Sequence, residues 1–204
     1  MRVGGAAAGT DRRERERGAS LIDVLLVLVL VAVAASLIAP VSASVADATR
    51  ARQAAGFVSS RLRLARAEAI NRRVNVGLVF DLVDGRWALR ICRDGTGNGL
   101  RRADIDAGDD ACFDGPHKFG DLFPGVEIAV DPLIPGPGGE AGGSDPVRFG
   151  SSDMASFSPA GSCTPGTLFL RTGRDRQYAI RIAGVNARTR AFRFDVGAWE
   201  WLEL

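Results

Sequence analysis

The stretch GASLIDVLLVLVLVAVAASLIAP, residues 18–40, decides the fold class of this chain. After Asp23 it is apolar as far as Ala39, with Ser36 as the one interruption. A helix rises roughly 1.5 Å per residue, so about 20 such residues reach across a bilayer. The stretch therefore predicts a transmembrane helix over residues 19–40.

The segment before this stretch is polar and rich in arginine. Residues 1–18 contain five Arg against three acidic residues. Basic flanks stay on the cytoplasmic side of a membrane, so the chain after residue 40 should lie on the opposite side. We therefore expect a single-pass membrane protein.

Asp23 distinguishes a retained anchor from a cleaved secretory signal. A secretory signal would be cut after its apolar stretch, where residues 39–43 offer small side chains. A carboxylate inside an apolar helix costs roughly 2.5–3.5 kcal/mol at the helix centre and less near an end. A discarded signal has no use for such a charge, whereas a retained helix can pair it with a positive group. The sequence favours the retained helix.

Residues 18–25, Gly-Ala-Ser-Leu-Ile-Asp-Val-Leu, resemble the type IV prepilin signature of Gly, an aromatic residue, Thr, Leu, Ile, Glu and aliphatic residues. The resemblance implies that prepilin peptidase removes residues 1–18 as a leader, cutting after Gly18, and methylates the new amino terminus at Ala19. The acid then falls at the fifth mature residue, Asp23, and a Pro at the twenty-second, Pro40. Ala19 in place of the aromatic residue and Asp23 in place of Glu depart from the signature.

Asp23 and Pro40 are the assembly residues that this resemblance implies. In pilin-like filaments the acid pairs with the amino terminus of a neighbouring subunit. Breaking a buried pair leaves a bare charge and costs roughly 3–5 kcal/mol, so Asp23 would fix the register of the subunits. Pro40 removes one helical hydrogen bond and should kink or loosen the helix.

Residues 41–73 have the pattern of an amphipathic continuation of this helix. Apolar residues recur at intervals of three or four and mark one face: Ala54, Val58, Leu62, Ala65 and Ala69. Arginines occupy much of the remaining surface: Arg50, Arg52, Arg61, Arg63, Arg66, Arg72 and Arg73. A solvated face is the simpler interpretation, and contact with acidic neighbours in a filament is the alternative.

The pattern becomes that of strands after Asn71. Residues 74–80 alternate in polarity, Asp84-Gly85 marks a turn, and residues 87–91 alternate again, which predicts a hairpin. The expected fold is α+β and type IV pilin-like, a long N-terminal helix packed on antiparallel β-sheets. Residues 74–204 would form its β-rich globular domain.

Three stretches resemble the GspH/FimT family in particular. They are residues 64–72, where the helix ends, and residues 166–170 and 178–182, which match late strands of that family. The family tail often reads Gly-Arg-x-Arg, and Ala187-Arg188-Thr189-Arg190 keeps the arginines without the Gly.

Residues 93–147 are rich in Gly, Pro and Asp and should form an acidic loop, in which residues 134–139 and 142–143 cannot pack regularly and should be a mobile surface loop. Segment 94–145 holds eleven acidic residues against Arg101, Arg102 and Lys118. Insertions on a β scaffold commonly carry specific contacts, so this acidic loop is our first choice for partner specificity.

The three cysteines do not form a C-x-x-C metal or redox pattern. Cys92 and Cys112 would close a disulfide around the acidic segment if the domain is extracytoplasmic. Pairing of either residue with Cys163 remains an alternative.

Asp94, Thr96 and Asn98 resemble the first half of a calcium loop, with oxygens at alternate positions and a Gly at the turn. Ile105 stands where the closing ligand is expected. A Gly/Asn turn between strands is therefore the default interpretation, and no cofactor is expected.

Residues 171–193 contain seven arginines and one acid, Asp175. A contact with DNA phosphates or with a partner would use Arg174, Arg176, Arg188 and Arg190, as a filament for DNA uptake would need. The simpler interpretation is the solvated side of a sheet, or a partner for the acidic loop. The charges after residue 18 balance at 21 basic and 21 acidic residues, so bulk charge does not support a nucleic-acid partner.

Catalysis finds little support in the sequence. His117 is the single histidine, and we interpret it as a loop residue beside Pro116. Ser158–Cys163 contains no Gly-x-Ser-x-Gly elbow, so nucleophilic catalysis is not expected. We expect a protein that is not an enzyme.

The resemblances imply a minor pseudopilin of a type II secretion system, a structural subunit near the pseudopilus tip that aids assembly and protein export. Its partners would be other pseudopilins, the prepilin peptidase, the inner-membrane assembly platform and exported cargo. It would be anchored in the inner membrane with its C-terminal domain in the periplasm. The alternative is a FimT-like minor pilin of a type IV pilus that binds DNA for uptake.

Overall fold

The computed structural model describes residues 20–173 and 176–204, without the side chains of residues 35–44. The chain divides into two units, Met1–Ser42 and Ala43–Leu204. Helix α1, Leu21–Arg72, contributes residues to both units. Each unit is described by itself.

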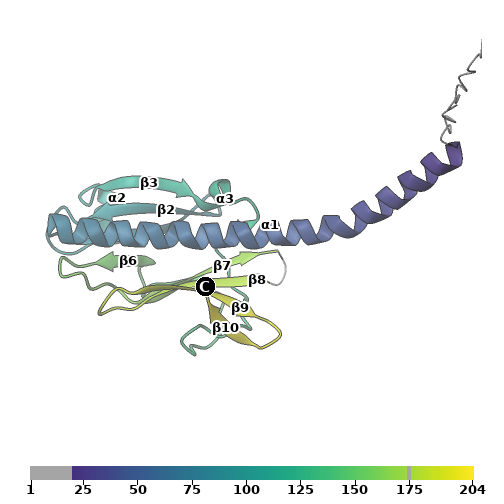
Figure 1. Cartoon of the computed structure of the whole chain (residues 1–204). Helices are drawn as coiled ribbons and strands as arrows, with labels where there is room; N and C mark the ends of the chain where they lie inside the picture. The colour runs from purple at the N-terminus through teal and green to yellow at the C-terminus, as the bar shows by residue number, and fades with distance from the viewer. Residues whose placement is uncertain (1–19, 174–175) are drawn as a thin grey trace, which may run out of the picture. The chain divides into compact units, whose positions relative to one another are not determined.

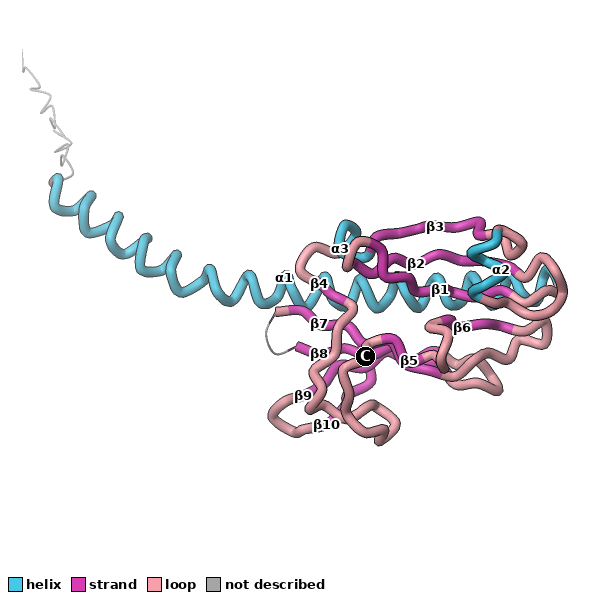
Figure 2. The backbone as a smooth tube through the Cα atoms, turned by 180° about the vertical axis from the view of Figure 1, so that it is seen from behind, coloured by secondary structure: helices cyan, strands magenta, loops and turns pink. Residues whose placement is uncertain are grey.

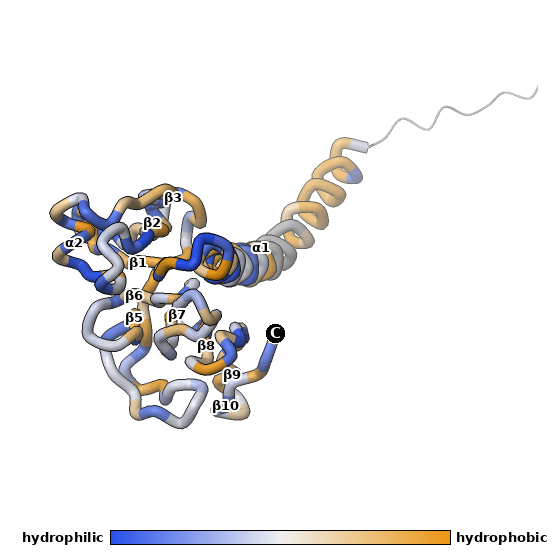
Figure 3. The backbone as a smooth tube through the Cα atoms, turned by 90° about the vertical axis from the view of Figure 1, so that its left-hand side faces the viewer, coloured by the Kyte–Doolittle hydropathy of each residue, from blue (hydrophilic) through white to orange (hydrophobic). Residues whose placement is uncertain are grey.

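Residues 21–34 of α1, in the first unit, are exposed, and all of them except Asp23 are apolar (Figure 3). Asp23 lies in the first helical turn, where its Oδ2 accepts a hydrogen bond of 3.3 Å from the backbone N–H of Ser20. Such an acid satisfies a donor that the helix leaves unpaired. Among the described residues, none of the helices combines the length and the apolarity that a membrane crossing requires. The span at residues 19–40 and the kink at Pro40 stay predictions.

The second part of α1 confirms the amphipathic pattern. All five residues of the predicted apolar face are buried: Ala54, Val58, Leu62, Ala65 and Ala69. Their spacing of three or four places them on one side of the helix, where burial of apolar surface stabilises the fold. Several arginines on the rest of the helix are exposed: Arg50, Arg52, Arg63 and Arg72.

A four-stranded antiparallel sheet follows the helix, with the order β3-β2-β1-β6. Its strands are β1 Val76–Val83, β2 Arg86–Arg93, β3 Cys112–Lys118 and β6 Met154–Phe157. The pairing of Val83 with Arg86 closes the predicted hairpin through Asp84 and Gly85. Both turn residues have positive φ, 53° and 71°, which is the conformation that an Asp-Gly turn between twisted strands requires.

The second antiparallel sheet has the order β10-β9-β8-β7-β4, with β5 also paired to β7. Its strands are β4 Val126–Glu127, β5 Val147–Arg148, β7 Gly166–Thr172, β8 Arg176–Ile182, β9 Thr189–Asp195 and β10 Glu200–Glu203. Strands β7 and β8 contain the two late stretches identified in the sequence, which pair from Gly166–Ile182 to Thr172–Arg176. The α+β fold of a helix and antiparallel sheets is thereby confirmed.

One hydrophobic core joins the helix to both sheets. Strands β2 and β3 lie on one side of this part of α1, and β7 to β10 lie on the other (Figures 1 and 2). The apolar face of the helix packs with Leu78 and Phe80 of the first sheet and with Leu170 and Tyr178 of the second. The helix therefore fixes the position of both sheets through this core.

The loop predicted for residues 93–147 is wrong as a description of that whole segment. It contains the short helices α2, Arg102–Ala107, and α3, Phe119–Leu122, as well as β3 and β4. Leu100 and Ile105 pack into a small cluster with Val79, Cys92 and Met154. Apolar contacts with distant residues order a segment whose local composition favours turns.

Candidate functional site

Several of the predicted site residues lie outside the described part of the chain. They are Gly18 and Ala19 of the cleavage site, and Arg174 of the tail. Pro40 belongs to α1, but its side chain is also outside the description. The cleavage and assembly roles of these residues stay predictions.

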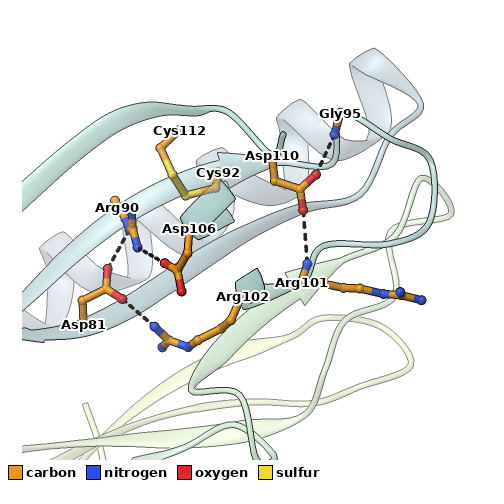
Figure 4. The surroundings of a disulfide bond; sticks show 9 residues. All are labelled: Asp81, Arg90, Cys92, Gly95, Arg101, Arg102, Asp106, Asp110 and Cys112. Atoms are coloured by element: carbon orange, nitrogen blue, oxygen red, sulfur yellow. Dashed lines mark hydrogen bonds and ion pairs between the residues drawn. A yellow bond between two sulfur atoms is a disulfide. The ribbon is translucent and has the colours of Figure 1, made fainter. Parts of the chain in front are cut away.

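Cys92 and Cys112 are joined by a disulfide (Figure 4). The two residues are partners across β2 and β3, so the bridge closes the segment between these strands. Cys163 is the free cysteine, half-buried, with its Sγ 3.3 Å from the carbonyl oxygen of Ala183. Burial raises the pKa of the Cys163 thiol to about 11, although nearby Arg66 opposes the shift, so the thiol is neutral at pH 7.

The sequence did not predict a network of charged side chains that lies beside the disulfide. Arg90 Nε lies 2.6 Å from Asp81 Oδ2, and Arg102 Nη1 lies 2.5 Å from Asp81 Oδ1 (Figure 4). Arg102 also donates to the backbone carbonyls of Phe80 and Ser152. It therefore ties α2 to β1 and to the turn before β6. Arg102 is 21 residues from Asp81 and 50 residues from Ser152 in sequence, so no local pattern could identify these contacts.

Asp94 holds a turn through hydrogen bonds from the backbone. Its Oδ1 accepts from the N–H groups of Thr96 and Gly97, and its Oδ2 accepts from that of Gly99. Asn98 donates its side-chain amide to Asp104. The carboxylate therefore faces donors, as the default turn interpretation requires. Within the described ranges, no group of three or more His, Cys, Asp or Glu side chains could hold a metal ion.

Asp110 holds the residues at the start of this turn and after it. It is buried, and it accepts hydrogen bonds from the N–H groups of Gly95 and Arg101 (Figure 4). Both ends of the turn are therefore fixed by buried carboxylates. Burial raises the pKa of Asp94, but hydrogen bonds from Asn75 and from backbone N–H groups outweigh it, so the pKa lies below its ordinary value of 3.8.

We expect Asp94→Asn to flatten the pH dependence of stability in acid. Because the folded-state pKa is lowered, the carboxylate contributes stability above its unfolded-state pKa and loses it as pH falls through the folded-state value, below 3.8. At neutral pH the variant should lose about 1–3 kcal/mol, because an amide meets donors that the carboxylate satisfied. Urea unfolding at neutral pH and at about pH 3 measures both effects. If the free energy of unfolding changed by the same amount between the two pH values in Asp94→Asn and in wild type, this role would be contradicted. The exposed Asp109→Asn is the control.

The lone histidine lies on strand β3 rather than in a loop. His117 Nε2 is 3.0 Å from Asp114 Oδ1, and Arg61 Nη1 of α1 is 2.8 Å from Asp114 Oδ2. Phe57 of α1 packs edge-on against the His117 ring. These contacts fasten the edge strand to the helix, which is a structural role.

The arginines of the tail meet carboxylates on the outer face of the second sheet. Arg181 Nη1 lies 2.7 Å from Glu140 Oε1, and Arg171 Nη2 lies 3.4 Å from Glu127 Oε2. Arg190 Nε lies 3.7 Å from Glu203 Oε1. Glu127 and Glu140 belong to the acidic segment, so the predicted pairing of that segment with the tail is observed for these two arginines.

Two adjoining hollows of about 390 Å³ each lie around Arg181. The one with more arginines defines the arginine groove, lined by Arg181, Arg188, Arg190, Asn186 and Phe192, with Pro137 and Gly138 above them. Arg176, the other predicted contact residue within the described chain, lines a separate hollow with Trp199 and Phe194. The structure thus brings Arg188 and Arg190 together and places Arg176 elsewhere.

A profile of the family described as type II transport protein GspH matches residues 54–186. This range runs from the buried face of α1 to the turn before β9, and it covers more than half of the chain. Neither the curated proteins nor the solved structures contain a significant match. The chain, with its helix packed on two antiparallel sheets, belongs to the GspH family of type II transport proteins.

Proposed function

We propose that this chain is a minor pseudopilin, a structural subunit near the tip of a type II secretion pseudopilus that aids assembly and protein export. The match to the GspH family over residues 54–186 carries this proposal. The amphipathic helix and the two sheets are what such a subunit needs in order to present a folded domain from a filament.

Anchoring in the inner membrane is part of the proposal. It rests on the apolar run of the sequence after Asp23 and on the basic segment before it. The globular domain would then lie in the periplasm, and the Cys92–Cys112 disulfide fits an oxidising compartment. The partners would be other pseudopilins, the prepilin peptidase and the inner-membrane assembly platform.

We expect the mature chain to begin with an N-methylated Ala19 when the full chain is produced together with prepilin peptidase. Asp23→Ala should be cleaved normally but enter filaments poorly, because a neighbouring amino terminus would lose its negative partner. Intact-mass analysis of the membrane extract and quantification of the subunit in sheared filaments measure the two effects. Asp47→Ala, which removes an acid on the same helix, is the control.

A start after residue 43, or an intact leader beside active peptidase, would overturn the proposal. Normal incorporation of Asp23→Ala would remove the role of this acid while leaving the processing result in place.

A FimT-like minor pilin that binds DNA is the second candidate. The specific observation in its favour is that Arg188 and Arg190 line one hollow together with Phe192, a combination of cations and an aromatic ring that suits single strands. Binding of an oligonucleotide to the full chain separates this candidate from the first, and the experiment below includes that comparison.

A further inference from the structure

The segment that covers the arginine groove is fixed at both ends and free of sheet pairing between them. We call residues 135–143 the strap. At its start, Trp201 Nε1 donates to the carbonyl oxygen of Pro135 at 2.8 Å. At its end, Arg148 donates to the carbonyl oxygens of Ala141 and Gly143 at 3.2 and 3.0 Å. The tip of the strap lies between these two anchors.

The tip places Glu140 in the adjoining hollow, where it contacts Arg181, a residue that also lines the arginine groove. A hydrogen bond of 2.8 Å from the N–H of Gly136 to the carbonyl oxygen of Glu140 closes a tight turn. Glu140 Oε2 accepts a hydrogen bond of 2.8 Å from the N–H of Gly138, and Oε1 lies 2.7 Å from Arg181 Nη1. Burial raises the pKa of Glu140, but N–H donors and Arg181 outweigh it, so the carboxylate is charged at neutral pH.

The backbone of the strap lies directly on the Arg181 guanidinium. A Cβ added to Gly138 would overlap Arg181 Nη1, so the close approach depends on a residue without a side chain. Among the described residues, the ion pair that links the tip to Arg181 is half-exposed, with side chains 38% and 44% exposed. Such a pair contributes little stability, so the tip can be displaced.

The groove contains positive charge that this ion pair does not neutralise. Arg181 and Arg190 are cross-strand partners and face the same side of the sheet. Among the described residues no carboxylate is paired with Arg188, and the Arg190–Glu203 contact is long at 3.7 Å. A second anion would find positive charge that is not neutralised beside Arg181.

We propose that the arginine groove binds an acidic, extended segment of a partner protein, and that Glu140 on the strap is an internal competitor that this segment displaces. The proposal rests on the proposed function only in that the chain acts by binding other proteins. Arg181 of the groove already contacts a carboxylate carried on a thin backbone segment, which is the chemistry of an acidic peptide. Nucleic acid fits less well, because the balanced charge after residue 18 creates no long-range attraction for a polyanion.

The test compares Glu140→Gln with Glu127→Gln in the full chain, held in detergent micelles. Both variants remove one negative charge from a pair with an arginine, but Arg171, the partner of Glu127, lines neither the arginine groove nor the adjoining hollow. The probes are a fluorescein-labelled peptide of alternating Glu and Gly, its Gln-Gly counterpart, and a labelled single-stranded oligonucleotide. Fluorescence anisotropy at low and physiological salt gives the dissociation constants.

We expect Glu140→Gln to bind the acidic peptide about two- to fivefold more tightly than wild type, as the loss of a half-exposed competing pair predicts. Glu127→Gln should equal wild type, and Arg188→Ala combined with Arg190→Ala should bind the peptide most weakly. Salt should weaken binding in each case.

Three results would overturn the proposal. They are equal affinities for Glu140→Gln and Glu127→Gln, equal affinities for the acidic and the Gln-Gly peptide, and a gain in affinity that appears for the oligonucleotide alone. The last result would assign the groove to nucleic acid and would support the DNA-binding candidate. None of them depends on cleavage at Gly18, so failure here and failure of the filament proposal are separate outcomes.

Discussion

Leu62→Ala is expected to lower the free energy of unfolding by about 3 kcal/mol. Leu62 lies on the buried face of α1, is 1% exposed, and belongs to the core that joins the helix to both sheets. Its removal takes apolar surface out of the core and leaves a cavity between elements that cannot close fully around it. Urea unfolding of the full chain in micelles, followed by tryptophan fluorescence, measures the loss.

Leu64→Ala is the matched control for this prediction. Leu64 is two residues away on the same helix, but its side chain is 38% exposed. The two substitutions change helix propensity equally, so their difference reports core packing alone. The control should lose less than about 1 kcal/mol. Similar losses for both variants would show that the face containing Leu62 is not the packed one.

Removal of the disulfide is expected to lower the free energy of unfolding by a similar amount, about 3 kcal/mol. The bridge joins residues 20 apart in sequence, and its main effect is to restrict the unfolded chain. The variant is Cys92→Ala combined with Cys112→Ser, because Cys92 is buried and a hydroxyl there would lack a partner. Urea unfolding under non-reducing conditions gives the value.

Cys163→Ser controls for the loss of a cysteine without a bridge. Cys163 is free and half-buried, so we expect its substitution to cost less than about 1 kcal/mol. A disulfide variant that is no less stable than this control would contradict the entropic role of the bridge. The segment between β2 and β3 would then be held by Asp94, Asp110 and Arg102 instead.

The apolar face of α1 and the first hairpin could be predicted because their signals are local. The spacing of Ala54, Val58 and Leu62 depends only on the helical repeat, and Asp84-Gly85 reports a turn whose φ angles its own residues favour. The strands at 166–170 and 178–182 were found through resemblance to a family. The structure and the family match agree with these predictions.

The segment 93–147 shows where local signals fail. Its Gly, Pro and Asp content favours turns, yet Leu100 and Ile105 are buried against residues from other strands, and strand β3 pairs with β2. Local signals could not predict the pairing of the disulfide either. The sequence left the partner of Cys92 open, and the register of β2 and β3 places Cys112 beside it.

The sequence could predict which residue types form the candidate site, but not which of them contact one another. The sequence showed a stripe of arginines and an acidic loop, but it did not show that Glu140 meets Arg181 or that Arg176 lies apart from Arg188. Asp94 shows the same limit, because its oxygens look like metal ligands in sequence and accept backbone hydrogen bonds in the fold.

The sequence by itself determined the long helix, its buried face, the hairpin and the membership of a family, because periodicity and turn chemistry act between near neighbours. The tertiary structure alone decided which carboxylate each arginine meets, which cysteine is free and what covers the groove. Ion pairs and disulfides need atoms within a few ångströms of one another. Residues that are tens of positions apart reach that distance only when the sheets pair in register and pack on the helix.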